Sequence, residues 1–482
     1  MKKIFALTLA LLMALMALAG CGRSDLIASL DPTGAPEDTP TEAPVIKPAE
    51  TGSVRPAGDF AVAAPDKAEY PVNPDSAVNS DGSVNWDEYD ALYSKWMAAV
   101  KERRESAGNA PDMNAFLKGL TKELLIAKEG GNIAFSPANI YIALAMLAEV
   151  TDGNTRAEIL SVLGSPDIEA LRTQTAALLS AESWDDGAEK CLLANSIWMN
   201  KDIIYNADTL KRLAEVYGAS SFSGDPALEE YSQALCQWLD ENTGGLLKDA
   251  IDGTRFTPEM VLAIASTIYF KDSWNIEFDK NRTYEDVFHA QSGDITCDFM
   301  HKTIMEGLVF RGENYTALKE SFKSGEGSMY MLLPDEGVSV AEMLSGGALD
   351  GFGVRGADLG SDWREMTVKL SVPKLDISSK FDLVNMLKNM GMHDCFNYTV
   401  SDFTPLTDLP ELYVDEITHA ARVKTDEEGI EAAAYTLIMV KANGMFMEHD
   451  EIELNFDRPF AFVVTGMTGA PLFVGVVNTP KN

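Results

Sequence analysis

The order of helical and strand-like patterns along the chain is the feature that most restricts its fold. From about Asp112 to the end, about 370 residues run without a linker-like segment. Helical periodicity dominates the first half of this stretch, and short apolar runs typical of strands dominate the second half. Separate groups of helices and strands indicate an α+β fold rather than alternating βα units.

Individual segments carry these patterns, and no internal repeat is apparent. Apolar residues at helical spacing predict helices over 113–127, 140–150, 156–163 and 231–247. Gly153-Asn154-Thr155 is expected to form a turn and N-cap before the third of them. Apolar runs predict strands over 191–199, 261–270, 329–333, 368–372, 460–465 and 472–477.

The N-terminus carries an export signal. Lys2 and Lys3 precede an apolar run over 4–19, which is typical of a secretory signal peptide over 1–20. The run ends in Leu18-Ala19-Gly20-Cys21, which resembles the lipobox of bacterial lipoproteins. That resemblance implies lipid on Cys21 and a position on the extracellular face of the cell membrane. The alternative is a plain secretion signal with an incidental cysteine.

Two segments separate this signal from the main body. Residues 21–81 are rich in Pro, Ala, Thr, Glu and Asp, and five prolines recur every four residues from Pro32 to Pro48. Such a composition buries too little apolar surface to order itself, so a disordered, lipid-anchored stalk is expected. Residues 82–111 form an N-terminal extension with a helix expected over 86–104. The main domain is then expected over 112–482.

The charge balance excludes one class of partner. The chain has 39 Lys and Arg against 74 Asp and Glu, for a formal net charge of −35. A nucleic-acid-binding protein would need a basic face, and none is apparent. The acidity suits a soluble surface that resists association, or attraction to basic partners.

Familiar catalytic and metal-binding motifs do not occur. The five histidines, His289, His301, His393, His419 and His449, show no metal-ligand spacing, and the sequence lacks nucleophile-elbow, P-loop and dinucleotide motifs. Cys191, Cys236, Cys297 and Cys395 form no CxxC pair; export permits disulfides, but free or buried thiols are expected. The chain is therefore expected not to be an enzyme and to need no cofactor or metal.

One segment near the C-terminus has an unusual composition. Over 430–441, the even-numbered side chains are small or apolar apart from one threonine hydroxyl, and the odd-numbered side chains carry both charges. This alternation suits a strand with an inner and an outer face. The first half is rich in alanine, which has little strand preference of its own. Taken alone, the segment equally fits a helix followed by a loop.

The segment resembles the reactive-centre-loop hinge of serpins. The hinge residues are Glu427, Glu428, Gly429, Ile430, Glu431, Ala432, Ala433 and Ala434. Further serpin-like motifs follow one another in the family's order, namely 132–137, 153–155, 238–245, 268–274, 373–374, 387–396, 402–403, His419, 456–460 and 471–475. The resemblance covers about 112–480. It implies mixed β-sheets with about nine helices and an exposed reactive-centre loop.

The resemblance implies a monomeric inhibitor of serine proteases, with cysteine proteases as a second target class. The family's loop length places the scissile bond at Asn443-Gly444, with Lys441 and Met445 as alternative positions. Cleavage would release the hinge into the central sheet, with the protease held as an acyl-enzyme. The alternative is a non-inhibitory serpin that acts as a binding or carrier module.

Some positions depart from the family pattern, and others match it. Ile430 replaces the usual threonine, and Cys236 replaces an asparagine. The resemblance places Trp274 at the entry of the opening sheet. It also places a polar cluster beneath that sheet, formed by Ser136, Asn139, Ser266 and His419. Serine and asparagine have changed places within this cluster, and we expect the two changes to compensate by keeping it hydrogen-bonded.

Overall fold

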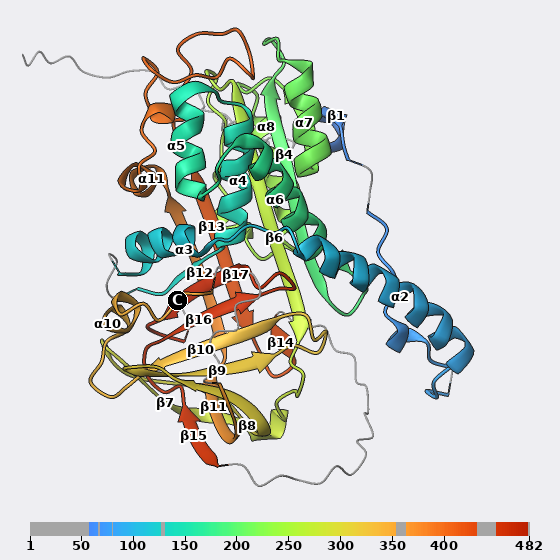
Figure 1. The fold of residues 1–482 in the computed structure, drawn as a ribbon, viewed down its shortest axis with the longest axis vertical. Coiled ribbons are helices and arrows are strands. Elements are labelled where there is room, and N and C mark those ends of the chain that lie inside the picture. The colour runs from blue at the N-terminus through green and yellow to red at the C-terminus, as the bar shows by residue number, and fades with distance from the viewer. Residues whose placement is uncertain are drawn as a thin grey trace, which may run out of the picture. The chain divides into compact units, whose positions relative to one another are not determined.

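The computed structural model describes residues 57–65, 68–79, 81–126, 131–352, 363–430 and 450–480 (Figure 1). All of them fall in one compact unit that begins at Val54. Two β-sheets and ten α-helices make up these ranges, which confirms the α+β class. No helix within the described ranges has both the length and the apolar composition needed to cross a bilayer.

The central sheet has the strand order β1-β5-β4-β6-β14-β13-β12, with β3 paired to β4. In chain order its strands are β1 (Ala61–Ala63), β3 (Trp184–Asp185), β4 (Lys190–Asn200), β5 (Ala219–Gly224), β6 (Leu262–Ser273), β12 (Leu375–Asp382), β13 (Thr418–Thr425) and β14 (Gly429–Ile430). β14 is antiparallel to both β6 and β13, so these two long strands run in the same direction.

The centre of this sheet is incomplete. Among the described residues, β6 and β13 are joined through β14 alone, and β14 supplies only two residues. The first five residues of β6, Leu262 to Ser266, are only partly buried. We call the strand position between β6 and β13 the slot; β14 occupies one end of it.

The second sheet lies below the helices in Figure 1 and has the order β15-β11-β8-β9-β10-β16-β17-β2, with β7 paired to β8. Its strands are β2 (Ile133–Phe135), β7 (Thr283–Ala290), β8 (Gly293–Arg311), β9 (Tyr315–Ser321), β10 (Ser328–Pro334), β11 (Arg364–Pro373), β15 (Glu451–Asn455), β16 (Phe460–Thr465) and β17 (Pro471–Val477). β16 and β17 are buried along their whole length, as their continuous apolar runs predict.

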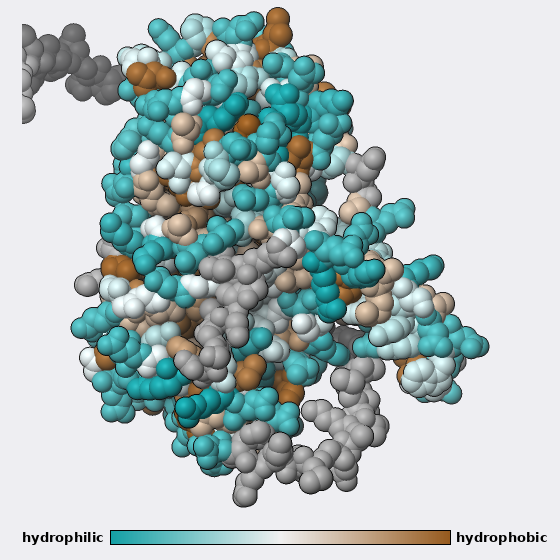
Figure 2. Space-filling view, viewed as in Figure 1, coloured by the Kyte–Doolittle hydropathy of each residue, from teal (hydrophilic) through white to brown (hydrophobic). Residues whose placement is uncertain are grey.

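The helices gather mainly at the other end of the central sheet. They are α2 (Trp86–Ala107), α3 (Asn114–Leu120), α4 (Pro137–Glu149), α5 (Gly153–Leu163), α6 (Ile168–Glu182), α7 (Ala207–Tyr217), α8 (Glu229–Asn242), α9 (Lys248–Ile251), α10 (Val340–Ser345) and α11 (Val384–Met390). Short helical turns are η1 (Ala57–Phe60), η2 (Pro74–Ser76), η3 (Thr121–Ile126), η4 (Lys280–Arg282) and η5 (Asp394–Phe396). Apart from residues drawn in grey, Figure 2 shows a mostly hydrophilic face with scattered apolar side chains.

Helix α4 illustrates how the sequence sets this core. Ser136 caps it by accepting the Asn139 backbone N–H, and Pro137 occupies its first position, where no N–H is needed. The helix is apolar on all sides and almost every residue is buried, so it forms the centre of the helical core.

Most predicted elements are confirmed, with shifts at their ends. The strand expected over 460–465 coincides with β16, and those over 191–199 and 261–270 correspond to β4 and β6. The third predicted helix begins earlier, at Gly153, and its N-cap is Asp152 instead of the predicted turn residues. Helix α8 ends at Asn242, before the predicted 247, because Gly244 and Gly245 adopt positive φ angles.

The end of the predicted stalk is wrong. Residues 57–65 and 68–79, expected to be disordered, contain β1, which pairs with β5, and η2, whose neighbour Ala77 is buried. The Phe60 ring lies 5.1 Å from the Tyr231 ring of α8. The few apolar residues in this segment find partners on the folded body, and composition alone does not reveal such partners.

Candidate functional site

The hinge enters the slot at Gly429 and Ile430. Ile430 pairs with Thr425 of β13 and with Asp272 of β6, and only 4% of it is exposed. A Cβ atom on Gly429 would lie 2.1 Å from the Asp272 carbonyl oxygen, so no larger residue fits without movement. Outside the described residues lie the other predicted hinge and loop positions, Glu431, Ala432, Ala433, Ala434, Lys441, Asn443, Gly444 and Met445.

Ion pairs hold the two glutamates that precede the slot. Glu427 is buried, its carboxylate lies 2.8 Å from Lys374 Nζ, and Thr283 Oγ1 donates to the same oxygen. Burial opposes ionisation of Glu427, but the hydrogen bonds from Lys374 and Thr283 hold its pKa below the usual value. Glu428 pairs with Lys280 at 2.5 Å. The chain therefore approaches the slot from a fixed direction.

Trp274 closes the same end of the slot. Its indole N–H donates to the Asp426 carbonyl oxygen at 2.9 Å, and its backbone N–H donates to the Glu428 carbonyl oxygen at 2.9 Å. The ring stacks on Phe322 with centroids 5.5 Å apart. Only 3% of Trp274 is exposed. The tryptophan thus ties the hinge turn to the end of β6.

The predicted polar cluster is assembled from three elements. The Ser136 backbone N–H donates to His419 Nε2 at 3.0 Å, and Asn139 Nδ2 donates to Ser266 Oγ at 2.8 Å. His419 lies on β13 and Ser266 on β6, so α4 contacts both strands that border the slot. Burial of His419 lowers its pKa to about 4, so the ring is a neutral acceptor at physiological pH.

The Asn139–Ser266 hydrogen bond makes the exchanged pair testable. Ser266→Asn alone should lower the free energy of native-state unfolding by about 1–3 kcal/mol, because two amides cannot both be satisfied in a site built for one. The double variant Asn139→Ser with Ser266→Asn should recover most of that loss. Urea unfolding of the parent, the two single variants and the double variant measures this coupling. Equal stability of the single variant and the parent would rule out compensation.

A segment after α8 lies over the slot. Arg422 of β13 donates to the Leu246 carbonyl oxygen at 3.2 Å, and Lys380 of β12 donates to that of Ala250 at 2.9 Å. On the other side, a Cβ on Gly244 would lie 2.5 Å from the Tyr269 ring of β6. Residues 243–251 therefore contact both borders of the slot and must shift if a longer strand enters.

Sequence reasoning missed a buried charged group beside the hinge. Asp272, Glu189 and Arg103 are all at most 6% exposed, and they come from β6, the β3–β4 turn and α2. Asp272 lies two residues beyond the strand predicted over 261–270 and next to Lys271, so no local signal marked it as buried. In the described ranges, no group of histidine, cysteine and carboxylate side chains could hold a metal ion. Cys191, Cys236 and Cys395 carry free thiols.

These features define a class of protein. Its central sheet holds an open strand position, a hinge seated at one end of that position and a polar cluster beneath it. The family model described as "Serpin (serine protease inhibitor)" matches residues 112–480. The chain belongs to the serpin family.

Known relatives support the assignment. An uncharacterised serpin-like protein of Thermococcus kodakarensis is 30% identical over 420 residues, which cover 85% of this chain and 94% of the relative. Serpin-ZX of Arabidopsis thaliana is 30% identical, with coverage of 73% and 93%. Among solved structures, the native state of the thermophilic serpin tengpin has a TM-score of 0.67 at 25% identity, covering 76% of this chain and 93% of tengpin.

Proposed function

We propose that this serpin inhibits serine proteases, and cysteine proteases as a second class, by trapping them as acyl-enzymes. The observation that carries the proposal is β14: the first two residues of the insertable segment already occupy the slot between β6 and β13. After a protease cleaves the loop, residues beyond Ile430 would continue the strand along the free edges. Entry of each residue releases energy stored in the incomplete sheet.

The reactive bond is proposed at Asn443-Gly444, with Lys441 and Met445 as the alternative positions. The support is the distance along the chain from Gly429, which the structure fixes as the start of β14. A basic residue at Lys441 would suit a trypsin-like protease, and Met445 would suit a chymotrypsin-like one. The position decides which proteases attack first.

The proposed location is the outer face of the cell membrane, with the chain held by lipid on Cys21. The lipobox-like sequence before Cys21 supports it, and the Pro-rich residues that follow would separate the inhibitor from the bilayer. Among the described residues Ala57 is already buried, so the proposed spacer ends before it and is shorter than the sequence alone suggests.

Trapping can be tested on the chain from Val54 onward, which contains the whole compact unit. Mixed with trypsin, chymotrypsin and subtilisin, it should give a denaturant-resistant band at the summed mass, and mass spectrometry should find a released peptide of residues 444–482. Protein cleaved without a partner should melt more than about 10 °C above the intact form. Complete cleavage without a complex or a rise in melting temperature would refute trapping.

A binding or carrier role is the second candidate, because the described residues form an open pocket of about 270 Å³. Its lining includes Lys319, Ser321, Tyr330, Phe352 and Thr465. Human thyroxine-binding globulin, solved in complex with its hormone, shares the fold with a TM-score of 0.66 at 22% identity. Cleavage without trapping would favour this role over inhibition.

A further inference from the structure

Asp272 ends β6 directly beneath the seated hinge. Its backbone pairs with Ile430, and Gly429 packs on its carbonyl oxygen. Only 3% of the residue is exposed, and the Ser273 backbone N–H donates to Oδ1 at 2.8 Å. Because directly opposite residues of an antiparallel pair place their side chains on the same face, the Ile430 side chain lies beside this carboxyl group. Withdrawal of Gly429 and Ile430 would remove that neighbour.

A second buried carboxyl group, Glu189, lies in the same cluster. Glu189 is 6% exposed, and its Oε1 atom lies 3.5 Å from Arg103 Nη2. Arg103 also donates through Nε to the Ala181 carbonyl oxygen at 2.9 Å and stacks 4.2 Å above the Trp184 ring. The Arg103 guanidinium thus pairs with Glu189, and its position is fixed by contacts outside that pair. We call Asp272, Glu189 and Arg103 the acid cluster.

Burial makes both carboxyl groups of the acid cluster weak acids. It raises the pKa of Asp272 to about 7, with the charge of Asp186 adding to the rise and hydrogen bonds from Ser324 and the Ser273 N–H opposing it. Burial raises the pKa of Glu189 to about 8; Arg103 lowers it, whereas Asp272 and Asp186 raise it further. Both groups therefore change charge near neutral pH.

Other charged groups surround the cluster, but most are already paired. Asp186 accepts hydrogen bonds from Trp96 and Asn73, Asp185 pairs with Lys190, and the hinge glutamates pair with Lys374 and Lys280. The titratable groups whose charges interact with it are Glu182 from α6, Asp186 from the β3–β4 turn, Cys191 from β4 and Tyr70 before α2. Its neighbours in chain or sheet are Asp185, Lys190, Lys271 and Lys323, with Glu427 and Glu428 in the hinge.

We infer that the acid cluster is a pH-dependent latch that holds the hinge in the slot when protonated and releases it when ionised. The inference rests on the proposed inhibitory function only in its consequence, because hinge release would change how the loop meets a protease. The contacts of Asp272 are hydrogen bonds from the Ser273 N–H and Ser324, so its ionised form is costly to keep buried. Departure of Ile430, the cross-strand neighbour of Asp272, would let water reach the ionised carboxylate and so lower that cost.

Proton linkage determines whether acid or base favours the seated hinge. The seated hinge keeps Asp272 protonated at a pH where an exposed aspartic acid is ionised, so the seated form binds more protons. Acid therefore favours the seated hinge, and a rise in pH favours the released hinge. Each linked proton changes the ratio of the two forms by up to about tenfold per pH unit.

Thermolysin provides a test that does not depend on trapping, because a metalloprotease forms no acyl-enzyme. The full chain is cleaved between pH 6 and 8.5, and each rate of cleavage within 431–449 is divided by that of a free peptide of the same sequence. This ratio should rise about tenfold or more across the range. In Asp272→Asn it should stay constant and low, and Glu189→Gln should weaken the dependence.

Asp408→Asn is the matched control, because Asp408 is exposed and lies in the loop before β13, outside both sheets. It should keep the parent's pH dependence. His289, whose pKa the hydrogen bond to Asp294 raises, is present in every variant and cannot cause a difference between them. A constant ratio in the parent, or an unchanged pH dependence in folded Asp272→Asn, would overturn the latch. If the cleavage ratio depends on pH as expected but no denaturant-resistant complex forms with subtilisin, only the inhibitory function would be overturned.

Discussion

Replacing Ile430 with glutamate should turn the inhibitor into a substrate. Ile430 is buried between β6 and β13, and the new carboxylate would lie opposite Asp272, which is itself buried. Burying an unpaired charge costs about 3 kcal/mol or more, and a barrier raised by that amount slows insertion about 100-fold. Hydrolysis of the acyl-enzyme would then outrun trapping. The measurements are the stoichiometry of inhibition and the yield of denaturant-resistant complex.

Ile430→Thr is the matched control, since threonine keeps the β-branched shape without a charge. It should form complexes at close to the parental yield, whereas the glutamate variant should be cleaved at the same bond without forming them. Melting before cleavage separates this effect from a folding defect. Undiminished complex formation by a folded Ile430→Glu protein would mean that the side chain at this position does not enter the sheet.

The sequence allowed much of this site to be predicted, because several of its parts have local signatures. The apolar runs of β16 and β17 match their complete burial, and Ser136 before Pro137 marks the start of α4. The cluster of His419, Asn139 and Ser266 came from the family resemblance, and its members lie within hydrogen-bonding distance of one another or of Ser136.

The acid cluster could not be predicted in the same way. Arg103, Glu189 and Asp272 have the residue types of an exposed surface, and each is typical of its local segment. Their burial arises only when α2, the β3–β4 turn and the end of β6 meet. The folded part of 57–79 escaped prediction for a related reason, because its few apolar side chains become stabilising only against β5 and α8.

The two groups of buried polar residues suit different tasks. Asn139, Ser266 and His419 link α4 to both borders of the slot through hydrogen bonds between neutral groups, which changes little between pH 6 and 9. The acid cluster lies at the mouth of the slot and changes charge over that same range. Closure of the slot and seating of the hinge can therefore respond to different conditions.

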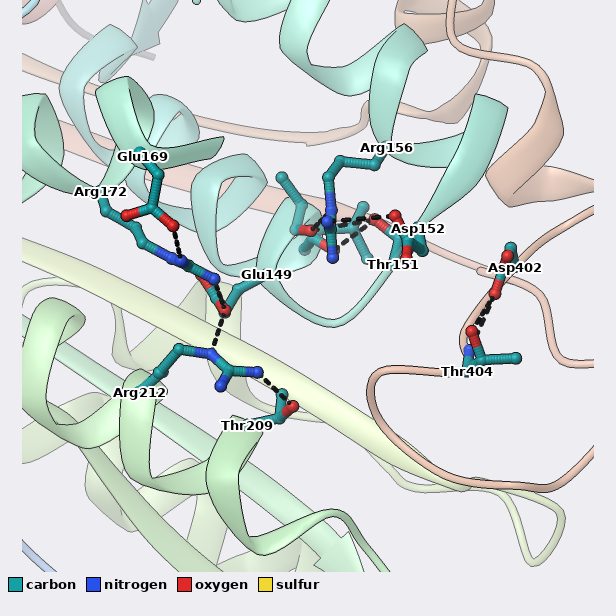
Figure 3. Close-up of polar contacts among 12 residues, drawn as sticks. Glu149, Thr151, Asp152, Arg156, Glu169, Arg172, Thr209, Arg212, Asp402 and Thr404 are labelled. Carbon is teal, nitrogen blue, oxygen red and sulfur yellow. Dashed lines mark hydrogen bonds and ion pairs between the residues drawn. The ribbon is translucent and has the colours of Figure 1, made fainter. Parts of the chain in front are cut away.

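Glu149→Gln should produce the largest loss of stability away from the slot. Glu149, at the end of α4, is completely buried and accepts hydrogen bonds from Arg172 at 2.6 Å and Arg212 at 2.7 Å (Figure 3). Tyr217 adds a third donor at 3.3 Å. The carboxylate thus joins α4, α6 and α7, and its removal leaves two guanidinium groups without their shared counter-charge. The expected loss is about 3 kcal/mol in native-state unfolding by urea.

The pH dependence of that loss provides a second readout. Burial opposes ionisation of Glu149, but hydrogen bonds from Arg172 and Arg212 bring its pKa below the usual value. A carboxyl group with a lowered pKa stabilises the fold above its unfolded pKa, and this contribution disappears as the pH falls through the folded value. The difference between parent and variant should therefore shrink in acid.

Glu169→Gln is the matched control for this prediction, because Glu169 pairs with the same Arg172 at 2.5 Å but its side chain is 77% exposed. Its removal should cost no more than about 0.5 kcal/mol at any pH. Equal losses in the two variants would show that the contact with Arg172, and not the burial of Glu149, sets the stability of this junction. A large loss in Glu149→Gln alone would identify the buried carboxylate as the group that fixes α6 and α7 to α4.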